Sequence, residues 1–261
     1  MSFNFISFAS GSKGNCSMVF TENTAIVIDA GISLKKLTQE LKNLGKCIED
    51  VKGVVVTHEH SDHVANICKY GMYVPVYAHL DTHVELFTRY DYVEQMGEVD
   101  DFMEGFTIGD IEVKPFEIPH DANAPVGYSF FAEGKQISIA TDMGEIRSNV
   151  FQSIKDSNIL LLEANHDLNM LIHGPYPAWL KKRVKGSHGH LSNIDSAKMA
   201  CMIKRESNNL HDLILGHISQ ENNIPELALN TVKGELEKEG LLGDTIVSVA
   251  SQHTPTKVFE A

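Results

Sequence analysis

The stretch Thr57-His-Glu-His-Ser-Asp-His63 decides how the rest of this chain is interpreted. Residues 58–63 of this stretch contain three histidines and an aspartate, all common metal ligands. An apolar run over residues 51–56 precedes the stretch and has the composition of a buried strand. A strand end holds side chains in fixed positions, and burying so many titratable groups unpaired would be costly. Because the cluster cannot easily face one ion but can straddle two, it predicts a centre with two metal ions.

Further candidate ligands come at or just after the ends of other predicted strands: Asp29, His120, Asp142 and His217. The carboxyl ends of strands meet at one edge of a sheet, where the active sites of α/β proteins usually lie. We therefore expect these four residues and the 57–63 stretch to converge on a single site.

The predicted elements alternate between strands and helices. Alternating or continuous apolar runs predict strands over 3–9 (half-buried), 24–29, 51–57, 74–78, 106–108, 111–118, 127–132, 136–141, 159–163, 213–216 and 246–250. Leucines spaced 3, 4 and 3 residues apart over 34–44 predict a helix that Ser33 caps and Gly45 ends, and two more helices are predicted over 193–206 and 225–239. Two half-domains, each a sheet with helices outside it, would form a four-layer αββα sandwich.

Composition favours one globular domain over residues 1–261, without repeats or a linker. No apolar run is long enough to span a bilayer, and the N-terminus lacks the features of a signal peptide. The four cysteines form no C-x-x-C pair, which is typical of reduced thiols, so we expect a cytoplasmic protein without membrane contact. A formal net charge of −13 argues against a general nucleic-acid binder, whereas 13 histidines favour metal binding.

The pattern H-x-H-x-D-H, followed by spaced His, Asp and His, resembles the metallo-β-lactamase superfamily. Its motifs match Asp29, residues 58–63, His120, Asp142 and His217. A narrower group, the YycJ/WalJ/VicX-type proteins, is similar in four further stretches: residues 10–16, 163–167, 176–177 and 189–193. That group resembles the tRNA 3′-processing endonuclease and the cyclic phosphodiesterases. Its members are described as 5′-to-3′ exonucleases on DNA, so the resemblance implies that activity here.

The resemblance also implies how the ligands divide between two divalent ions. It assigns three histidines to the first ion, His58, His60 and His120. It assigns the second ion to Asp62, His63 and His217. Asp142 would bridge the ions, and Asp29 would orient the cluster through hydrogen bonds. Imidazole and carboxylate ligands suit Zn²⁺ or Mn²⁺, and the sequence does not choose between these metals.

The expected chemistry is attack of a metal-bridging hydroxide on phosphorus. Asp62 would orient this nucleophile or take its proton. By resemblance His190 is the first candidate for the general acid that protonates the leaving oxygen, and His166 is the second. His166 could instead contact a substrate phosphate or a metal. The alternative for either histidine is a purely structural role, for His190 that of a loop residue capping the helix from Asn193.

An insert over residues 166–189 carries the densest basic run of an acidic chain. Lys181, Lys182 and Arg183 could guide a nucleic-acid backbone toward the metals, and Trp179 could offer a stacking face. The alternative is a solvated helix face with Trp179 packed into the core.

Two other classes of function stay open from the sequence. One is a hydrolase of the same fold that acts on a small phosphodiester, a thioester or a lactam, although such relatives usually lack the Gly-His-Leu-Ser element of residues 189–192. The other is a metal-bearing regulator without catalytic activity. Because all seven expected ligands are present, the sequence favours an enzyme over a regulator. The Gly-His-Leu-Ser element, the basic insert and the resemblance favour a nucleic acid as its substrate, DNA in the first instance.

Overall fold

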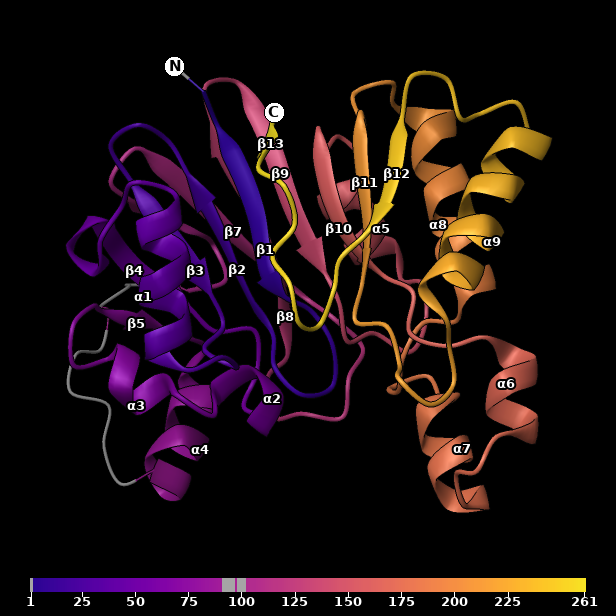
Figure 1. Cartoon of the computed structure of the whole chain (residues 1–261), viewed down its shortest axis with the longest axis horizontal. Helices are drawn as coiled ribbons and strands as arrows, with labels where there is room; N and C mark the ends of the chain where they lie inside the picture. Colours follow the sequence, from indigo (N-terminus) through magenta and orange to yellow (C-terminus); the bar gives the residue numbers. More distant parts are fainter. Residues whose placement is uncertain (1, 91–96, 98–101) are drawn as a thin grey trace.

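A computed structural model describes residues 2–90, 97 and 102–261. Two β-sheets lie face to face, and helices cover their outer sides (Figure 1). The first sheet contains β1 (Asn4–Ala9), β2 (Cys16–Phe20), β3 (Ala25–Ile28), β4 (Val51–Val55), β5 (Val76–Tyr77) and β13 (Phe259–Glu260). Its strands follow the order β13-β1-β2-β3-β4-β5.

The second sheet has a parallel half and an antiparallel half. It contains β6 (Phe106–Ile108), β7 (Ile111–Glu117), β8 (Val126–Ala132), β9 (Lys135–Ala140), β10 (Ile159–Glu163), β11 (Asp212–Gly216) and β12 (Ile246–Val249). The strands run in reverse chain order from β12 to β6, and β9 to β12 are parallel. The carboxyl ends of β9, β10 and β11 therefore meet at one edge of the sheet, as predicted.

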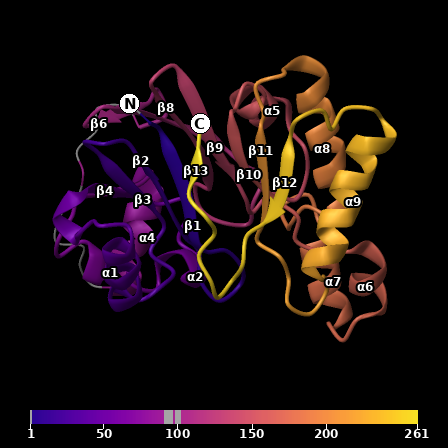
Figure 2. The same ribbon diagram turned by 45° about the horizontal axis from the view of Figure 1, so that its top comes forward.

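Helices flank each sheet on its outer side. Those of the first half are α1 (Leu34–Asn43), the 3-10 turn η1 (Ile48–Asp50), α2 (Ser61–Val64), α3 (Ile67–Tyr70) and α4 (Leu80–Tyr90). Those of the second half are α5 (Ser148–Ile154), α8 (Asn193–Glu206) and α9 (Pro225–Lys238), whereas α6 (Leu168–His173) and α7 (Ala178–Val184) lie beyond the carboxyl ends of its strands (Figure 1). In a view turned by 45°, α8 and α9 still lie outside the second sheet and α1 outside the first (Figure 2). Nowhere in the described ranges is a helix both long and apolar enough to cross a bilayer.

Three apolar layers hold these elements together. Phe5 and Tyr128 belong to the layer between the two sheets. Leu37 of α1 packs on the outer face of the first sheet, and Val232 of α9 packs on that of the second. Sheets with apolar layers on both faces produce the four-layer αββα sandwich that the sequence predicts.

Local signals place several of the elements. The hydroxyl of Ser33 accepts a hydrogen bond from the backbone N–H of Lys36 and caps α1, and Gly45 follows the helix with a φ of 71°.

The prediction of a half-buried strand over residues 3–9 is wrong, because β1 is buried on both faces. Phe5 packs between the sheets while Phe8 packs under the helices, so alternate side chains enter two different cores.

Candidate metal centre

Three candidate site residues have a backbone conformation that residues other than glycine rarely adopt. Asp29 and His217 directly follow β3 and β11, Asp142 lies two residues after the end of β9, and their φ angles are 62°, 53° and 61°. A positive φ is uncommon outside glycine and clusters at functional sites, where the surrounding structure enforces it. Here it turns the chain sharply at each strand end, so that the three side chains enter the same space.

The first group of donor atoms consists of three histidines. His58 follows β4 and is completely buried, while His60 occupies the position before α2 and His120 follows β7. The Nδ1 atom of His60 lies 3.1 Å from Nε2 of His58 and 3.2 Å from Nε2 of His120. Three ring nitrogens this close to one another, with no carboxylate among them, form a pocket that one cation would fill.

The second group combines a carboxylate with two histidines. The Oδ2 atom of Asp62 lies 3.5 Å from Nε2 of His63 and 3.5 Å from Nε2 of His217. Donor atoms of all three residues fall within 4.8 Å of one another, as they do in the first group. The structure thus brings together the two triads that the resemblance implied.

The carboxylate of Asp142 lies between the two groups. Its Oδ2 atom is 3.4 Å from Nε2 of His63, and its Oδ1 atom is 3.4 Å from Nε2 of His217 and 3.9 Å from Nε2 of His120. Oδ2 is buried and accepts no hydrogen bond from any described residue. A buried carboxylate oxygen without a hydrogen bond is costly unless a cation neutralises it. The arrangement therefore fits divalent cations on both sides of Asp142.

Electrostatics divide the histidines into two classes. Burial and the surrounding histidines hold the pKa of His58 well below its usual value, and burial also lowers the pKa of His120. Burial opposes protonation of His63 as well, but the carboxylates of Asp29, Asp142 and Asp62 outweigh it and raise the pKa to about 9. Neutral imidazoles bind metals directly, whereas a cation at the second group must displace a proton from His63.

Asp29 contacts His63 and the backbone of Thr57. Its Oδ2 atom lies 2.7 Å from Nδ1 of His63, and its Oδ1 atom accepts a 2.8 Å hydrogen bond from the backbone N–H of Thr57. The Nδ2 atom of Asn15, in the turn after β1, lies 3.1 Å from Oδ2 of Asp62 and 3.0 Å from Nε2 of His63. The structure therefore places Asp29 in contact with His63, whereas sequence reasoning missed the contacts of Asn15.

Glu163 is the most important residue that sequence reasoning left without a role. It ends β10, is completely buried, and places Oε1 2.7 Å from Nδ1 of His190 and 3.2 Å from Nδ1 of His217. Burial alone would raise the pKa of Glu163, but His190 and His217 outweigh it and hold that pKa well below its usual value. Its position at a strand end beside the other acids was the available signal.

The two histidines considered for proton donation lie in different surroundings. His190 is half-buried and lines the cavity at the metal centre. His166 is 1% exposed, does not line that cavity, and neither of its ring nitrogens has a hydrogen-bond partner in the described structure. Burial lowers the pKa of His166 to about 4, so the ring is neutral near pH 7. Proton donation to a substrate therefore fits His190 better than His166.

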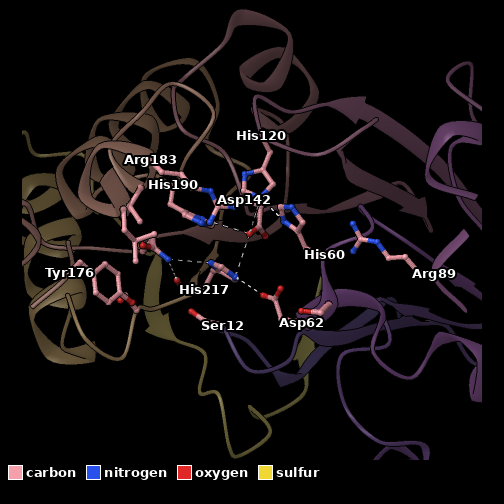
Figure 3. Close-up of a pocket in the computed structure, with 15 residues that line it drawn as sticks. Ser12, His60, Asp62, Arg89, His120, Asp142, Tyr176, Arg183, His190 and His217 are labelled. Carbon is pink, nitrogen blue, oxygen red and sulfur yellow. Dashed lines mark hydrogen bonds and ion pairs between the residues drawn. The ribbon is translucent and has the colours of Figure 1, made fainter. Parts of the chain in front are cut away.

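A cavity of about 370 Å³ opens over the metal centre. Figure 3 shows Arg183 and Tyr176 of the insert on one side and Arg89 of α4 on the other. Arg183 forms a two-pronged ion pair with Asp121, whose Oδ1 atom lies 3.6 Å from Nε2 of His120. The insert therefore forms one wall of the site and is tied to a loop that carries a candidate ligand.

The other basic residues of the insert lie elsewhere. Lys181 donates a 2.8 Å hydrogen bond to the carbonyl of Ile172 and joins α7 to α6, and Lys182 is exposed outside the cavity lining. Trp179 is 68% exposed, so the alternative that it packs into the core is wrong. Of the three basic residues considered, only Arg183 lines the cavity.

Comparison with known proteins adds independent findings. A family model described as "Beta-lactamase superfamily domain" matches residues 24–218. The chain is 35% identical to the exodeoxyribonuclease WalJ of Streptococcus pneumoniae serotype 2 (strain D39 / NCTC 7466), over 92% of this chain and 90% of that protein. It is also 35% identical to the exodeoxyribonuclease YycJ of Bacillus anthracis, over 99% of each. Among solved structures, the metallo-β-lactamase fold protein YhfI from Bacillus subtilis matches with a TM-score of 0.72 at 14% identity, covering 99% of this chain and 100% of that one.

Proposed function

Because the chain belongs to the β-lactamase superfamily and has the metallo-β-lactamase fold, we propose that it is a phosphodiesterase with two metal ions that degrades DNA from the 5′ end. One observation carries the proposal: the buried carboxylate of Asp142 lies between two triads of donor atoms. Relatives that cover nearly the whole chain are named exodeoxyribonucleases, which supports DNA as the substrate.

The donor chemistry fits two divalent cations. His58, His60 and His120 would hold one ion, and Asp62, His63 and His217 would hold the other, with Asp142 shared between them. Nitrogen and carboxylate ligands suit Zn²⁺ or Mn²⁺. When bound, such ions supply Lewis acidity toward a phosphoryl oxygen and lower the pKa of a coordinated water to about 7.

The chain's own groups then divide the remaining tasks. Burial opposes ionisation of Asp62, but His63 and His217 outweigh it and hold its pKa well below the usual value. A carboxylate this weakly basic is a poor proton acceptor, so Asp62 orients the nucleophile by accepting a hydrogen bond. His190 donates a proton from Nε2 to the leaving oxygen, because Glu163 occupies Nδ1 and fixes the ring.

Substrate binding falls to the walls of the cavity. Arg89 and Arg183 face it from two sides and supply positive charge for a phosphate backbone, in a chain whose net charge is −13. Trp179, exposed on the same helix as Arg183, offers an aromatic face for a base. The insert over residues 166–189 acts as the nucleic-acid-binding part of one domain that spans residues 1–261. A cytoplasmic location is part of the same proposal and rests on the cysteine pattern, which has no C-x-x-C pair.

The test is digestion of 5′- and 3′-labelled DNA and RNA, single- and double-stranded, with Mn²⁺, Zn²⁺ or a chelator. We expect metal-dependent loss of nucleotides from the 5′ end of DNA, which Asp142→Ala abolishes. Asp244→Asn, a matched change at an exposed position, serves as the control. If none of these nucleic acids is cleaved while bound metal is measured in the protein, the nuclease function is wrong. Hydrolysis of bis(p-nitrophenyl) phosphate or of a thioester would then identify the other class of hydrolase.

A further inference from the structure

A second cavity, of about 320 Å³, lies beside the candidate metal centre. This volume is at the small end of the roughly 300–1,000 Å³ that ligand pockets occupy. Its walls come from the loop between β11 and α9 and from the residues that follow β12. Both segments begin at the edge of the second sheet that also carries the candidate metal ligands.

The two cavities share a wall. The candidate ligand His217 lines the first cavity, the next residue, Ile218, lines the second, and Ser219 lines both. Ser10 lines the second cavity and accepts a 2.9 Å hydrogen bond from the backbone N–H of His217. The second cavity is therefore the neighbouring site for a group adjoining a phosphate that lies at the candidate metal centre.

The chemistry of the two linings differs. Arg89 and Arg183 line the first cavity, whereas no Asp, Glu, Lys or Arg among the described residues lines the second. Ile218, Pro225 and Val249 give the second cavity apolar surface. Gln220, Gln252 and His253 add polar side chains to that surface, whereas the amide of Asn223 is fully hydrogen-bonded within the protein. An uncharged, apolar cavity with a few polar groups suits a flat heteroaromatic ring with donors and acceptors on its edge.

Gln252 has a side-chain amide without a hydrogen-bond partner among the described residues. Its Oε1 and Nε2 atoms are both buried, and neither has a hydrogen-bond partner in the described parts of the chain. The amide lies against Gly11, and leaving it unpaired is unfavourable. A rotation of the Gln252 side chain toward the cavity lets a ligand pair with it and supply the interaction that the protein does not provide. A glutamine amide presents a donor and an acceptor side by side, which matches the edge of a nucleobase.

We propose that the second cavity is a subsite for the nucleobase of a nucleotide beside the scissile phosphodiester, and that Gln252 pairs with the edge of this base. The subsite rests on the proposed nuclease function, because the phosphate of the same substrate occupies the metal centre. The subsite also gives the enzyme a contact with a nucleobase in addition to its contacts with the sugar-phosphate backbone of DNA.

The kinetic test uses 5′-phosphorylated oligonucleotides with an abasic residue at the first or the second nucleotide. Wild type should cleave the intact oligonucleotide about five- to tenfold faster than at least one abasic version, as expected for the loss of a hydrogen-bonded base. Gln252→Met keeps the side-chain volume but removes the amide, and should reduce this ratio. Gln39→Met, at an exposed position on α1, should preserve it. Equal rates on intact and both abasic substrates would overturn the proposal while leaving the nuclease function intact.

A binding test separates the subsite from catalysis. Deoxynucleosides without phosphate are titrated into the zinc-loaded protein, and backbone amide signals of residues 249–253 are followed by NMR. We expect these signals to shift in wild type and to stay unchanged in Val249→Phe, which fills the cavity from β12. If DNA is not cleaved while bis(p-nitrophenyl) phosphate is hydrolysed, the nuclease function is wrong. This titration alone then decides whether the second cavity binds a nucleobase. Shifts of residues 249–253 then support a nucleobase site, and their absence overturns it.

Discussion

The Nδ1 atom of His190 lies 2.7 Å from the Oε1 atom of Glu163, whose side chain is completely buried. The other carboxylate oxygen accepts hydrogen bonds of 2.9 and 3.1 Å from the backbone N–H groups of Met143 and Leu191. The carboxylate therefore cannot rotate away, and it fixes both the ring of His190 and its tautomer.

Replacing His190 should slow the reaction without emptying the metal centre. We expect His190→Ala to lower kcat on DNA by about 10²–10⁴, the usual contribution of a general acid. Metal content, measured by mass spectrometry after dialysis, should equal that of wild type. A variant that loses metal in parallel with activity would show that His190 is a ligand, and a fully active variant would exclude it from catalysis.

Glu163 should act through His190, and the leaving group distinguishes this positioning role from a structural one. Glu163→Gln should lower kcat on DNA by about 10- to 100-fold, as is typical of groups that orient a functional histidine. The loss should be smaller on thymidine 5′-p-nitrophenyl phosphate, because p-nitrophenolate leaves without a proton. Equal losses on both substrates would indicate that Glu163→Gln disturbs the whole site.

Asp29 should control metal affinity. It contacts Nδ1 of His63 at 2.7 Å and the backbone N–H of Thr57 at 2.8 Å, so it sets the direction of one candidate ligand. We expect Asp29→Asn to weaken binding of the second ion by about 10- to 100-fold. Competition with a chromophoric chelator measures the two affinities. Unchanged affinity for both ions would show that His63 keeps its orientation without Asp29.

Much of this site could be predicted because its candidate metal ligands follow strands. The strands are recognisable as apolar runs, and the histidines and acids that follow several of them are visible without a structure. The left-handed backbone of Asp29, Asp142 and His217 could not be predicted, because it is enforced by the packing around three separate strand ends. Glu163 was missed for a related reason: it lies within the apolar run of β10 and reads as the last residue of a buried strand.

The insert was harder to interpret from sequence alone. Its basic composition suggested a role for all of Lys181, Lys182 and Arg183, but a helix turns successive side chains in different directions. Only Arg183 lines the cavity, while Lys181 bonds to the carbonyl of Ile172. The composition therefore indicated the segment that lines the cavity, and the orientation of α7 determines that Arg183 is the basic residue of the three that does so.

The metal-free protein should lose stability as the pH rises. Asp29, Asp142 and Asp62 outweigh burial and raise the pKa of His63 to about 9, whereas a histidine in the unfolded chain titrates near 6.5. Because the folded state binds this proton more tightly, the contribution is fully present below about pH 6.5 and is lost as the pH rises through about 9. Urea denaturation of chelator-treated protein across this range should show the loss. Asp29→Asn should show a smaller one, and equal losses in both proteins would contradict the prediction.

Arg183 and Lys182 provide a direct comparison within one helix. Arg183 lines the cavity and pairs with Asp121, whereas Lys182 is exposed outside the lining. If Arg183 contacts a phosphate, Arg183→Gln should weaken binding of single-stranded DNA and reduce the slope of log K against log salt by about 0.7, the value for one released counterion. Lys182→Gln removes the same charge, but we expect its slope to stay close to that of wild type. Fluorescence anisotropy at several salt concentrations, on protein with the metals bound and a non-hydrolysable phosphorothioate oligonucleotide, measures both. If the two variants behaved alike, binding would depend on the net charge of the insert, and the position of Arg183 in the cavity would not matter.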